Sequence, residues 1–399
     1  MISVAEALTR ITAAFEPVPG ETVALSEGLG RVLAADVTAR LTQPPAAVSA
    51  MDGYAVRAAD VADPPVRLRV VGHVPAGGVY EGTIGPGQAA RIFTGAPVPA
   101  GADAIVIQED TEADGDHVLI KAAAAQGRYI RPAGLDFRAG EVGLRAGQRL
   151  GPRDIGLAAA MNWPWLRVRR RPRVAILSTG DEIVLPGEPL GRSQIVSSNG
   201  PALAAFVTAC GAQPQHLGIA TDDRAALAAL VAEAEGADLL VTTGGVSVGE
   251  HDLVREVLGT RGFDLDFWKI AMRPGKPLMF GRIGTTPILG LPGNPVSALV
   301  CAILFLGPAI DALLGVPATS GPGERAYLGR DLPANDHRQE YLRARLDIDS
   351  AGRRIAMPFE RQDSSMLATL ARADCLVVRP PHAAPAKAGE AIEIIPLSI

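Results

Sequence analysis

The first residues of the chain repeat apolar side chains at helical spacing. Ser3 and Glu6 form a capping box, in which each side chain accepts a hydrogen bond from the backbone N–H of the other residue. The apolar positions that follow lie on one face of a helix: Val4, Leu8, Ile11 and Phe15. We therefore expect an amphipathic helix that ends at Pro17.

From residue 22 to residue 149 the pattern changes to short apolar stretches separated by glycine and proline, which is typical of strands and turns. Residues 152–161 then predict a helix with proline in its first turn. Five of the seven residues from Arg167 to Arg173 are arginines. Such a run can bind a polyanion, but we interpret it as a solvated linker into the next domain.

Short strands alternate with helices from residue 173 to about residue 316, which predicts a mostly parallel sheet covered by helices on both faces. The expected strands are residues 174–177, 215–219, 238–241, 264–270, 277–280 and 287–291. The expected helices are residues 201–210, 222–236, 252–258 and 295–306. After residue 316 the pattern returns to strands, at residues 341–348, 375–378 and 391–395, so the chain ends in a small all-β domain.

The composition fits a globular protein of roughly two to three domains. Of the 399 residues, 48% are hydrophobic and only 4% are aromatic, and the net charge is −5. Few aromatic rings and an acidic balance argue against a nucleic-acid binder. The three cysteines are far apart in the sequence, so neither a disulfide framework nor a zinc ribbon is expected.

The sequence predicts neither a membrane span nor a leader. The longest apolar run, residues 298–306, is stopped by Gly307-Pro308 and is too short to cross a bilayer. The first residues lack the basic and apolar regions of a signal peptide. We therefore expect a cytoplasmic protein that does not act on membranes.

Acidic side chains follow three successive strands of the predicted sheet: Glu182, Asp222 and Asp252. The carboxyl ends of parallel strands meet at one edge, where sites in such sheets lie. Asp222 and Asp252 also suit helix capping, which is the alternative interpretation. Three carboxylates crowded on one edge repel each other unless they share a cation, and hard oxygen ligands suit Mg²⁺ bridging to a substrate phosphate.

Three loops at the same edge are suited to an anion. The glycine loop at residues 244–249 lacks the P-loop lysine but can wrap backbone N–H groups around an anion. Residues 273–277 place two cations on a loop stiffened by two prolines, and residues 291–297 place a rigid turn at a helix start. The alternative interpretation of each loop, taken alone, is a structural turn without a ligand. The ligand-binding residues that we predict in them are Gly244, Gly245, Ser247, Gly249, Arg273, Lys276, Pro292, Asn294, Pro295 and Ser297.

Two motifs of the N-terminal half acquire a meaning only in combination with these loops: Ser-Ala-Met-Asp-Gly-Tyr-Ala at 49–55 and Phe-Thr-Gly-Ala-Pro-Val-Pro at 93–99. They are followed, in order, by Ser-Thr-Gly-Asp-Glu at 178–182, Gly-Gly-Val-Ser-Val-Gly-Glu-His-Asp at 244–252, Pro-Gly-Lys-Pro at 274–277 and Leu-Pro-Gly-Asn-Pro-Val-Ser at 291–297. In this combination the whole chain resembles the molybdopterin molybdenumtransferases of the MoeA type, which include the E domain of gephyrin.

The resemblance implies an elongated homodimer whose subunits have four domains. Residues 1–46 with 134–172 would form a discontinuous linking domain, and residues 47–133 an inserted β-rich domain. Residues 173–317 would form the α/β molybdopterin-binding domain, and residues 318–399 a small β-barrel.

The resemblance also implies an activity, the insertion of molybdate into adenylylated molybdopterin with Mg²⁺-dependent release of AMP. Molybdopterin adenylyltransferase would supply the substrate. The catalytic residues carried over are Asp52, Thr94, Glu182, Asp222 and Asp252, the first two presented by the partner subunit and the last three also as metal ligands. Further matches are two functional prolines, a ligand-contacting lysine, a cation and a serine, namely Pro292, Pro295, Lys276, Arg273 and Ser364.

The sequence leaves two other functions open. A scaffold that binds pterin or clusters a partner would share the fold, but it has no need of all three acids. A nucleotide hydrolase of related α/β fold would not need the two N-terminal motifs.

Overall fold

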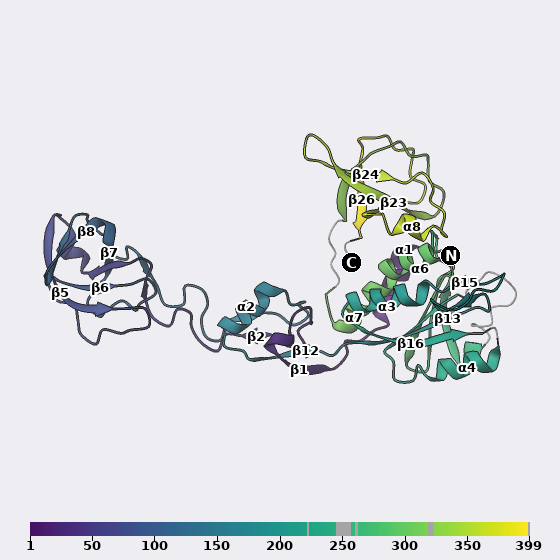
Figure 1. Cartoon of the computed structure of the whole chain (residues 1–399), viewed down its shortest axis with the longest axis horizontal. Coiled ribbons are helices and arrows are strands. Elements are labelled where there is room, and N and C mark those ends of the chain that lie inside the picture. Colours follow the sequence, from purple (N-terminus) through teal and green to yellow (C-terminus); the bar gives the residue numbers. More distant parts are fainter. Residues whose placement is uncertain (222, 245–256, 260–261, 318–322, 398–399) are drawn as a thin grey trace.

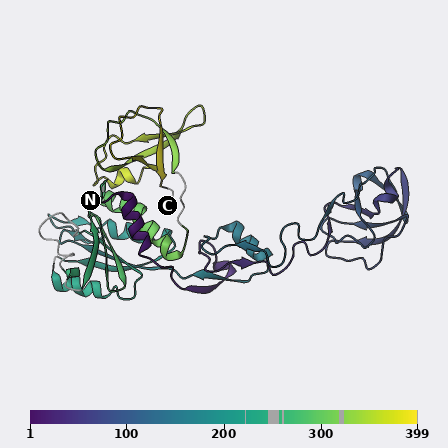
Figure 2. The ribbon, with the colours of Figure 1, turned by 180° about the vertical axis from the view of Figure 1, so that it is seen from behind.

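The computed structural model describes residues 1–221, 223–244, 257–259, 262–317 and 323–397. The subunit is elongated (Figure 1): a β-rich domain lies at one end, a small linking domain follows, and the α/β domain and a C-terminal barrel lie together at the other end. The view from behind shows the same separation (Figure 2).

Helix α1 (Val4–Ala13) begins where the amphipathic pattern predicts it but ends at Ala13, so Phe15 and Pro17 lie beyond its end. The Ser3 hydroxyl accepts the Glu6 backbone N–H at 3.1 Å, as the capping box requires. The Glu6 carboxylate, however, pairs with Arg10 at 2.6 Å. The expected return bond to Ser3 is therefore replaced by an i,i+4 ion pair, which competes for the same carboxylate.

The central sheet of the α/β domain has the strand order β16-β13-β17-β21-β20-β18. β16, β13, β17 and β21 are parallel, whereas β20 runs antiparallel to both of its neighbours. The bounds are β13 (Arg173–Thr179), β16 (Gln213–Ala220), β17 (Leu239–Thr243), β18 (Phe263–Trp268), β20 (Met279–Ile283) and β21 (Thr286–Leu291). The expected mostly parallel sheet is confirmed, with β20 as the reversed strand.

Both faces of this sheet are buried, as the alternation of strands and helices predicts. On β13, Val174 and Ile176 belong to a core shared with α1, α3 (Asn199–Ala209) and the helix that follows β21. The intervening Ala175 and Leu177 face a second core with α4 (Arg224–Ala232). The sheet is thus held rigidly from both sides, with its carboxyl edge free for a site.

The apolar helix after β21 is longer than expected. It comprises α6 (Pro295–Cys301), a π-helical turn (Ala302–Leu306) and α7 (Gly307–Leu314). The expectation that it ends before Gly307-Pro308 is wrong, because the widened π turn accommodates a proline that has no N–H to donate. Its 20 residues are long and apolar enough to cross a membrane, but 61% of its most apolar window is buried in the fold. It is the central core helix of this domain.

The linking domain is built from two short antiparallel pairs and one helix. β1 (Gly20–Ala24) pairs with β12 (Trp165–Arg169), β2 (Val37–Thr38) pairs with β11 (Val142–Leu144), and α2 is Pro152–Ala160. Residues 167–169 of the arginine-rich segment belong to β12 and Arg173 opens β13, so four of its seven residues are strand rather than linker. Arg170, between the two strands, binds Asp238 through two hydrogen bonds of 2.7 Å, which ties this domain to the α/β domain.

The β-rich domain is a six-stranded sheet with the order β7-β4-β6-β5-β9-β8. Its strands are β4 (Gly53–Val56), β5 (Val66–Val74), β6 (Gln88–Ile92), β7 (Ala104–Ile107), β8 (Thr111–Asp114) and β9 (His117–Ile120). The short pair β3 (Val48–Ser49) and β10 (Ile130–Arg131) lies where the chain enters and leaves it.

The C-terminal domain is a closed five-stranded barrel, because β25 pairs with both β26 and β23. Its strands are β22 (Glu324–Leu328), β23 (Gln339–Ile348), β24 (Arg354–Pro358), β25 (Cys375–Arg379) and β26 (Ala391–Pro396), with a short helix α8 (Leu367–Leu370). β19 (Met272–Arg273) of the α/β domain pairs with β23 from outside. The predicted fold class is confirmed: a central α/β domain, an inserted β-rich domain and a small barrel.

Candidate functional site

A cavity of about 560 Å³ opens at the carboxyl edge of the α/β sheet. It lies where β13, β17 and β21 end, as expected for a parallel sheet. Its lining comes from these strand ends, from β14 (Ile183–Val184) and β15 (Ile195–Val196), from the starts of α3 and the core helix, from the 273–277 loop and from one barrel residue. The lining residues are Ser178, Thr179, Glu182, Ile183, Ile195, Val196, Ser197, Ser198, Asn199, Thr243, Gly244, Pro277, Pro292, Gly293, Asn294, Pro295, Ser297 and Ser365.

The wall of the cavity needs glycine at position 244. Gly244 has φ +88°, and a Cβ placed there would lie 2.4 Å from the carbonyl oxygen of Thr179. A Cβ on Gly293 would lie 3.5 Å from the Cα of Gly244. The loops after β17 and β21 thus approach each other backbone to backbone, which exposes peptide groups instead of side chains to a ligand.

Hydrogen bonds lock the two loops together. The Asn199 side-chain amide donates to Thr243 Oγ1 and to the carbonyl oxygen of Gly293, both at 2.8 Å. The buried Thr243 hydroxyl donates to the carbonyl oxygen of Pro292 at 3.2 Å. Sequence reasoning missed Asn199 and Thr243, although Asn199 opens a helix and Thr243 directly precedes the glycine loop. Both side chains shape the cavity and line it.

The core helix begins at the cavity with Asn294 as N-cap and Pro295 in its first turn. The Asn294 amide donates to Ser364 Oγ at 2.9 Å, and the Val296 backbone N–H donates to the Ser364 carbonyl oxygen at 3.2 Å. A loop of the C-terminal barrel therefore caps this helix and reaches the cavity. Ser364 and the predicted residues of the 291–297 loop are brought together at this point.

The acids predicted as metal ligands are placed only in part. Glu182 is exposed and lines the cavity. Asp222 and Asp252 lie outside the described residues, as do Gly245, Ser247 and Gly249. Within the described ranges no cluster of three metal-binding side chains occurs. The N-cap of α4 is Asp223, whose carboxylate accepts the Ala226 N–H at 2.8 Å.

The donor chemistry of the cavity nevertheless fits a hard cation. Its described lining offers carboxylate, hydroxyl and carbonyl oxygens and contains neither cysteine nor histidine. The Thr179 hydroxyl is buried and has no hydrogen-bond partner in the described part of the chain. Ala220, the last residue of β16, pairs with Thr179 of β13, so β16 ends beside a residue that lines the cavity. Oxygen donors of this kind suit Mg²⁺.

The two predicted cations take different places. Arg273 does not line the cavity; it pairs with Glu340 at 2.7 Å and with Asp336 at 3.7 Å, both on the C-terminal barrel. Lys276 is exposed and directly precedes Pro277, which lines the cavity. Arg273 thus joins two domains, whereas Lys276 is an exposed neighbour, in the chain, of a residue that lines the cavity.

Asp52 and Thr94 lie together, but far from this cavity. Asp52 Oδ1 accepts the Thr94 backbone N–H and the Thr94 hydroxyl, both at 2.7 Å. The backbone and then the side-chain hydrogen bond of Thr94 lower the pKa of the Asp52 carboxyl. The pair sits in the β-rich domain, at the opposite end of the subunit from the α/β domain (Figure 1). One subunit therefore does not unite the two halves of the predicted site.

Three family models match the chain in succession. Residues 2–162 match the MoeA N-terminal region (domain I and II), residues 175–312 a probable molybdopterin binding domain, and residues 325–397 the MoeA C-terminal region (domain IV). The chain belongs to the MoeA family.

Similar proteins agree with this membership. Molybdopterin molybdenumtransferase 2 of Mycobacterium tuberculosis is 44% identical over 82% of this chain and 83% of its own length. Molybdopterin molybdenumtransferase of Bacillus subtilis is 34% identical over 99% of this chain and 94% of its own. A solved molybdopterin biosynthesis MoeA protein from Pyrococcus horikoshii OT3 superposes with a TM-score of 0.87 at 28% identity and covers 99% of both chains.

As a MoeA family member, this protein is a transferase of molybdenum cofactor biosynthesis. All the described lining residues of the cavity except Ser365 lie within the segment that matches the molybdopterin-binding model. The matching residues of the N-terminal model include Asp52 and Thr94. The cavity residues and the Asp52–Thr94 pair therefore both lie in segments that match MoeA family models.

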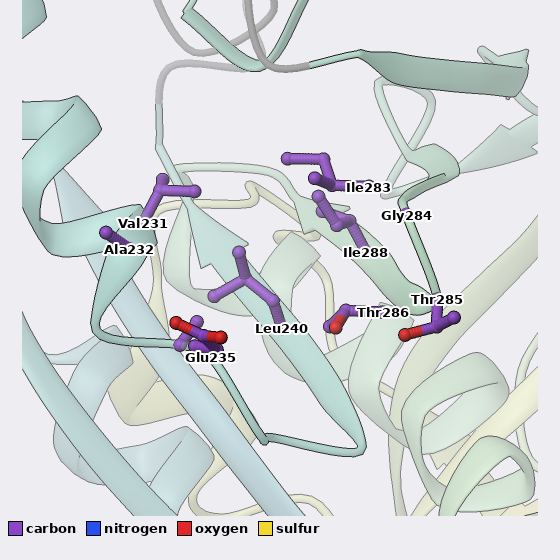
Figure 3. Close-up of a pocket in the computed structure, with 10 residues that line it drawn as sticks. Val231, Ala232, Glu235, Leu240, Ile283, Gly284, Thr285, Thr286 and Ile288 are labelled. Atoms are coloured by element: carbon purple, nitrogen blue, oxygen red, sulfur yellow. The ribbon is translucent and has the colours of Figure 1, made fainter.

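A second cavity, of about 310 Å³, lies at the other end of the strands (Figure 3). It is lined by the end of α4, by Leu240 of β17 and by the β20–β21 hairpin. Figure 3 labels one charged side chain in it, Glu235, among apolar and threonine side chains. This cavity lacks the converging polar groups of the carboxyl edge, so we assign the chemistry to the cavity at the carboxyl edge.

Proposed function

We propose that this protein inserts molybdate into adenylylated molybdopterin and releases AMP in a Mg²⁺-dependent step. The observation that carries the proposal is the cavity at the carboxyl edge of the molybdopterin-binding segment, where Gly244 and Gly293 bring backbone groups to a ligand beside the start of the core helix. A helix start offers N–H groups and a partial positive charge to an anion, and here it adjoins the loop that carries Lys276.

Each part of the cavity has a proposed task. The backbone at Gly244 and the start of the core helix bind the anionic part of the substrate, and Lys276 holds phosphate or molybdate oxygens. Glu182, with Asp222 and Asp252, is proposed to bind Mg²⁺. The metal, when bound, neutralises the diphosphate and favours the departure of AMP. Asn199 and Thr243 keep the two loops in register while the substrate is bound.

We further propose that the site is completed by a second subunit in a homodimer. The β-rich domain that carries the Asp52–Thr94 pair lies at the far end of the elongated chain from the cavity (Figure 2), which supports a site completed by another chain. In a two-fold dimer each subunit offers its Asp52–Thr94 pair to the other, which creates two equivalent sites. Molybdopterin adenylyltransferase is the proposed donor of the substrate, and the cytoplasm the proposed place of action.

The proposal is tested by incubating the purified protein with adenylylated molybdopterin, molybdate and MgCl₂. AMP and metal-loaded cofactor should appear together, and chelation of Mg²⁺ should stop both. Glu182→Gln should bind substrate but release AMP at least tenfold more slowly, because a metal ligand is lost from an exposed position without a change in the core. AMP release that is indifferent to chelation, or no AMP at all, would refute the proposal.

A further inference from the structure

Four large apolar side chains are exposed within one short segment at the mouth of the cavity. β14 (Ile183–Val184) and β15 (Ile195–Val196) pair in parallel, and we call residues 183–196 the flap. The exposed fractions of its apolar side chains are 48% for Leu185, 56% for Leu190, 60% for Ile195 and 42% for Val196. Scattered apolar residues on a surface are normal, but a group of them indicates a binding surface.

The two ends of the flap adjoin residues that line the cavity. The Ile195 N–H donates to the carbonyl oxygen of Glu182 at 2.7 Å, and the Ser197 N–H donates to that of Val184 at 2.8 Å. One end of the flap therefore follows Glu182, and the other end leads within three residues to Asn199. These hydrogen bonds hold both ends of the flap. They therefore fix Ile195 and Val196 relative to Glu182, which lines the same cavity.

Only part of the flap lines the cavity. Ile183, Ile195 and Val196 belong to the lining, whereas Leu185 and Leu190 do not. These three are the only large aliphatic side chains among the described lining residues, which are otherwise serine, threonine, glycine, proline, asparagine and Glu182. The cavity thus combines an aliphatic patch with a polar and glycine-rich remainder.

We propose that Ile195 and Val196 form the subsite for the flat ring system of the pterin. A fused heteroaromatic ring has polar edges and two apolar faces, and branched aliphatic side chains cover such a face while leaving the edges to hydrogen-bond donors and acceptors. The anionic end of the same molecule is left to the glycine wall and the helix start. This inference rests on the proposed use of the cavity for molybdopterin, and it adds the residues that select a flat ring.

The test measures equilibrium binding of molybdopterin without the adenylyl group, under anaerobic conditions and without molybdate or Mg²⁺. Ile195→Ser and Val196→Ser should each raise the Kd about fivefold, because part of an aliphatic contact area is lost. Ile195→Leu should restore binding to within about twofold, since volume and apolar character are kept. The matched control is Leu190→Ser, which changes an equally exposed side chain of the same flap outside the cavity and should leave the Kd unchanged.

The outcomes separate this inference from the proposed reaction. Failure of the wild-type protein to release AMP would refute the reaction and leave the binding comparison valid. The subsite would be overturned if Ile195→Ser bound molybdopterin like the wild type, or if Leu190→Ser weakened binding equally. It would also be overturned if Ile195→Ser and Val196→Ser left molybdopterin binding intact but weakened the dimer. Sedimentation measures the dimer, and this result would make the flap a subunit contact. Melting temperatures measured alongside exclude a loss that is due to unfolding.

Discussion

At the scale of single residues, the site depends on a position that tolerates only glycine. Gly244→Ala should lower the free energy of unfolding by about 2 kcal/mol, since its φ of +88° disfavours an L side chain and its Cβ would meet the Thr179 carbonyl oxygen at 2.4 Å. Molybdopterin binding should fall with it. The control is Gly156→Ala in α2, where a Cβ meets nothing within 4 Å; this change should stabilise the protein by about 0.5–1 kcal/mol. Urea unfolding measures both.

Another residue-scale prediction concerns the ionisation of Asp52. Thr94→Val removes the hydroxyl donor and keeps the backbone N–H, so the pKa of Asp52 should rise but stay below its ordinary value. Since the folded pKa is lowered, the pair stabilises the fold above the unfolded pKa, and this stability is lost as the pH falls through the folded pKa, that is, below about pH 4.

Carboxyl ¹³C NMR titration measures this shift. Asp363, whose pKa is lowered by the hydroxyl and backbone N–H of Ser365, is the internal control and should not move. A pKa of Asp52 that is identical in the wild type and Thr94→Val would show that the hydroxyl does not act on the carboxylate. Between pH 5 and pH 8 the ionised form of Asp52 should persist in both proteins.

At the scale of elements, the cap of α1 is the most local test. Ser3→Ala should destabilise the protein by about 1 kcal/mol, because the N–H of Glu6 loses its acceptor at the start of a helix that packs on the core. Glu6→Gln should cost less than about 0.5 kcal/mol, since its exposed pair with Arg10 contributes little. Thermal unfolding of the two variants should rank them in this order; the reverse order would mean that the ion pair, not the cap, fixes the helix end.

Elements with a strong local pattern could be predicted from the sequence. The run of buried residues around Val174 and the amphipathic spacing after Ser3 gave a strand and a helix close to their observed bounds, because both patterns depend on neighbours in the chain. The continuation of the core helix through Pro308 could not be predicted in this way, because it depends on a π turn stabilised by packing. The closure of the barrel by β23 and β25 depends on register between distant strands.

The residues of the candidate site also fall into two groups, those that sequence motifs could predict and those that only the tertiary structure reveals. Motifs placed Glu182, Asn294 and Pro295 at one edge, because the carboxyl ends of parallel strands must meet. They could not show that Arg273 pairs with Glu340, or that Asn199 joins the loops after β17 and β21, because those contacts span 67 and 94 residues of chain, and only the tertiary structure brings them together.

At the scale of the whole molecule, the shape of the chain is the reason why we propose a site shared between two chains. The β-rich domain that carries Asp52 and the α/β domain that carries the cavity lie at opposite ends of one chain (Figure 1). Arg170–Asp238 and Arg273–Glu340 hold the linking, α/β and C-terminal domains to each other. The elongated shape favours the proposed site shared between two chains over one that is formed within a single chain.

The most direct measurement of this account is the activity of a mixed dimer of Asp52→Ala and Glu182→Ala, each inactive on its own as a homodimer. If the site is shared, one site of the mixed dimer collects both lesions and the other is wholly native, so AMP release should recover to about half of the wild-type rate per dimer. The two variants are co-expressed with different affinity tags and the doubly tagged dimer is isolated, with wild-type dimers purified identically as the control. A correctly folded mixed dimer that remains inactive would contradict the account, because every site would then carry one lesion within its own chain.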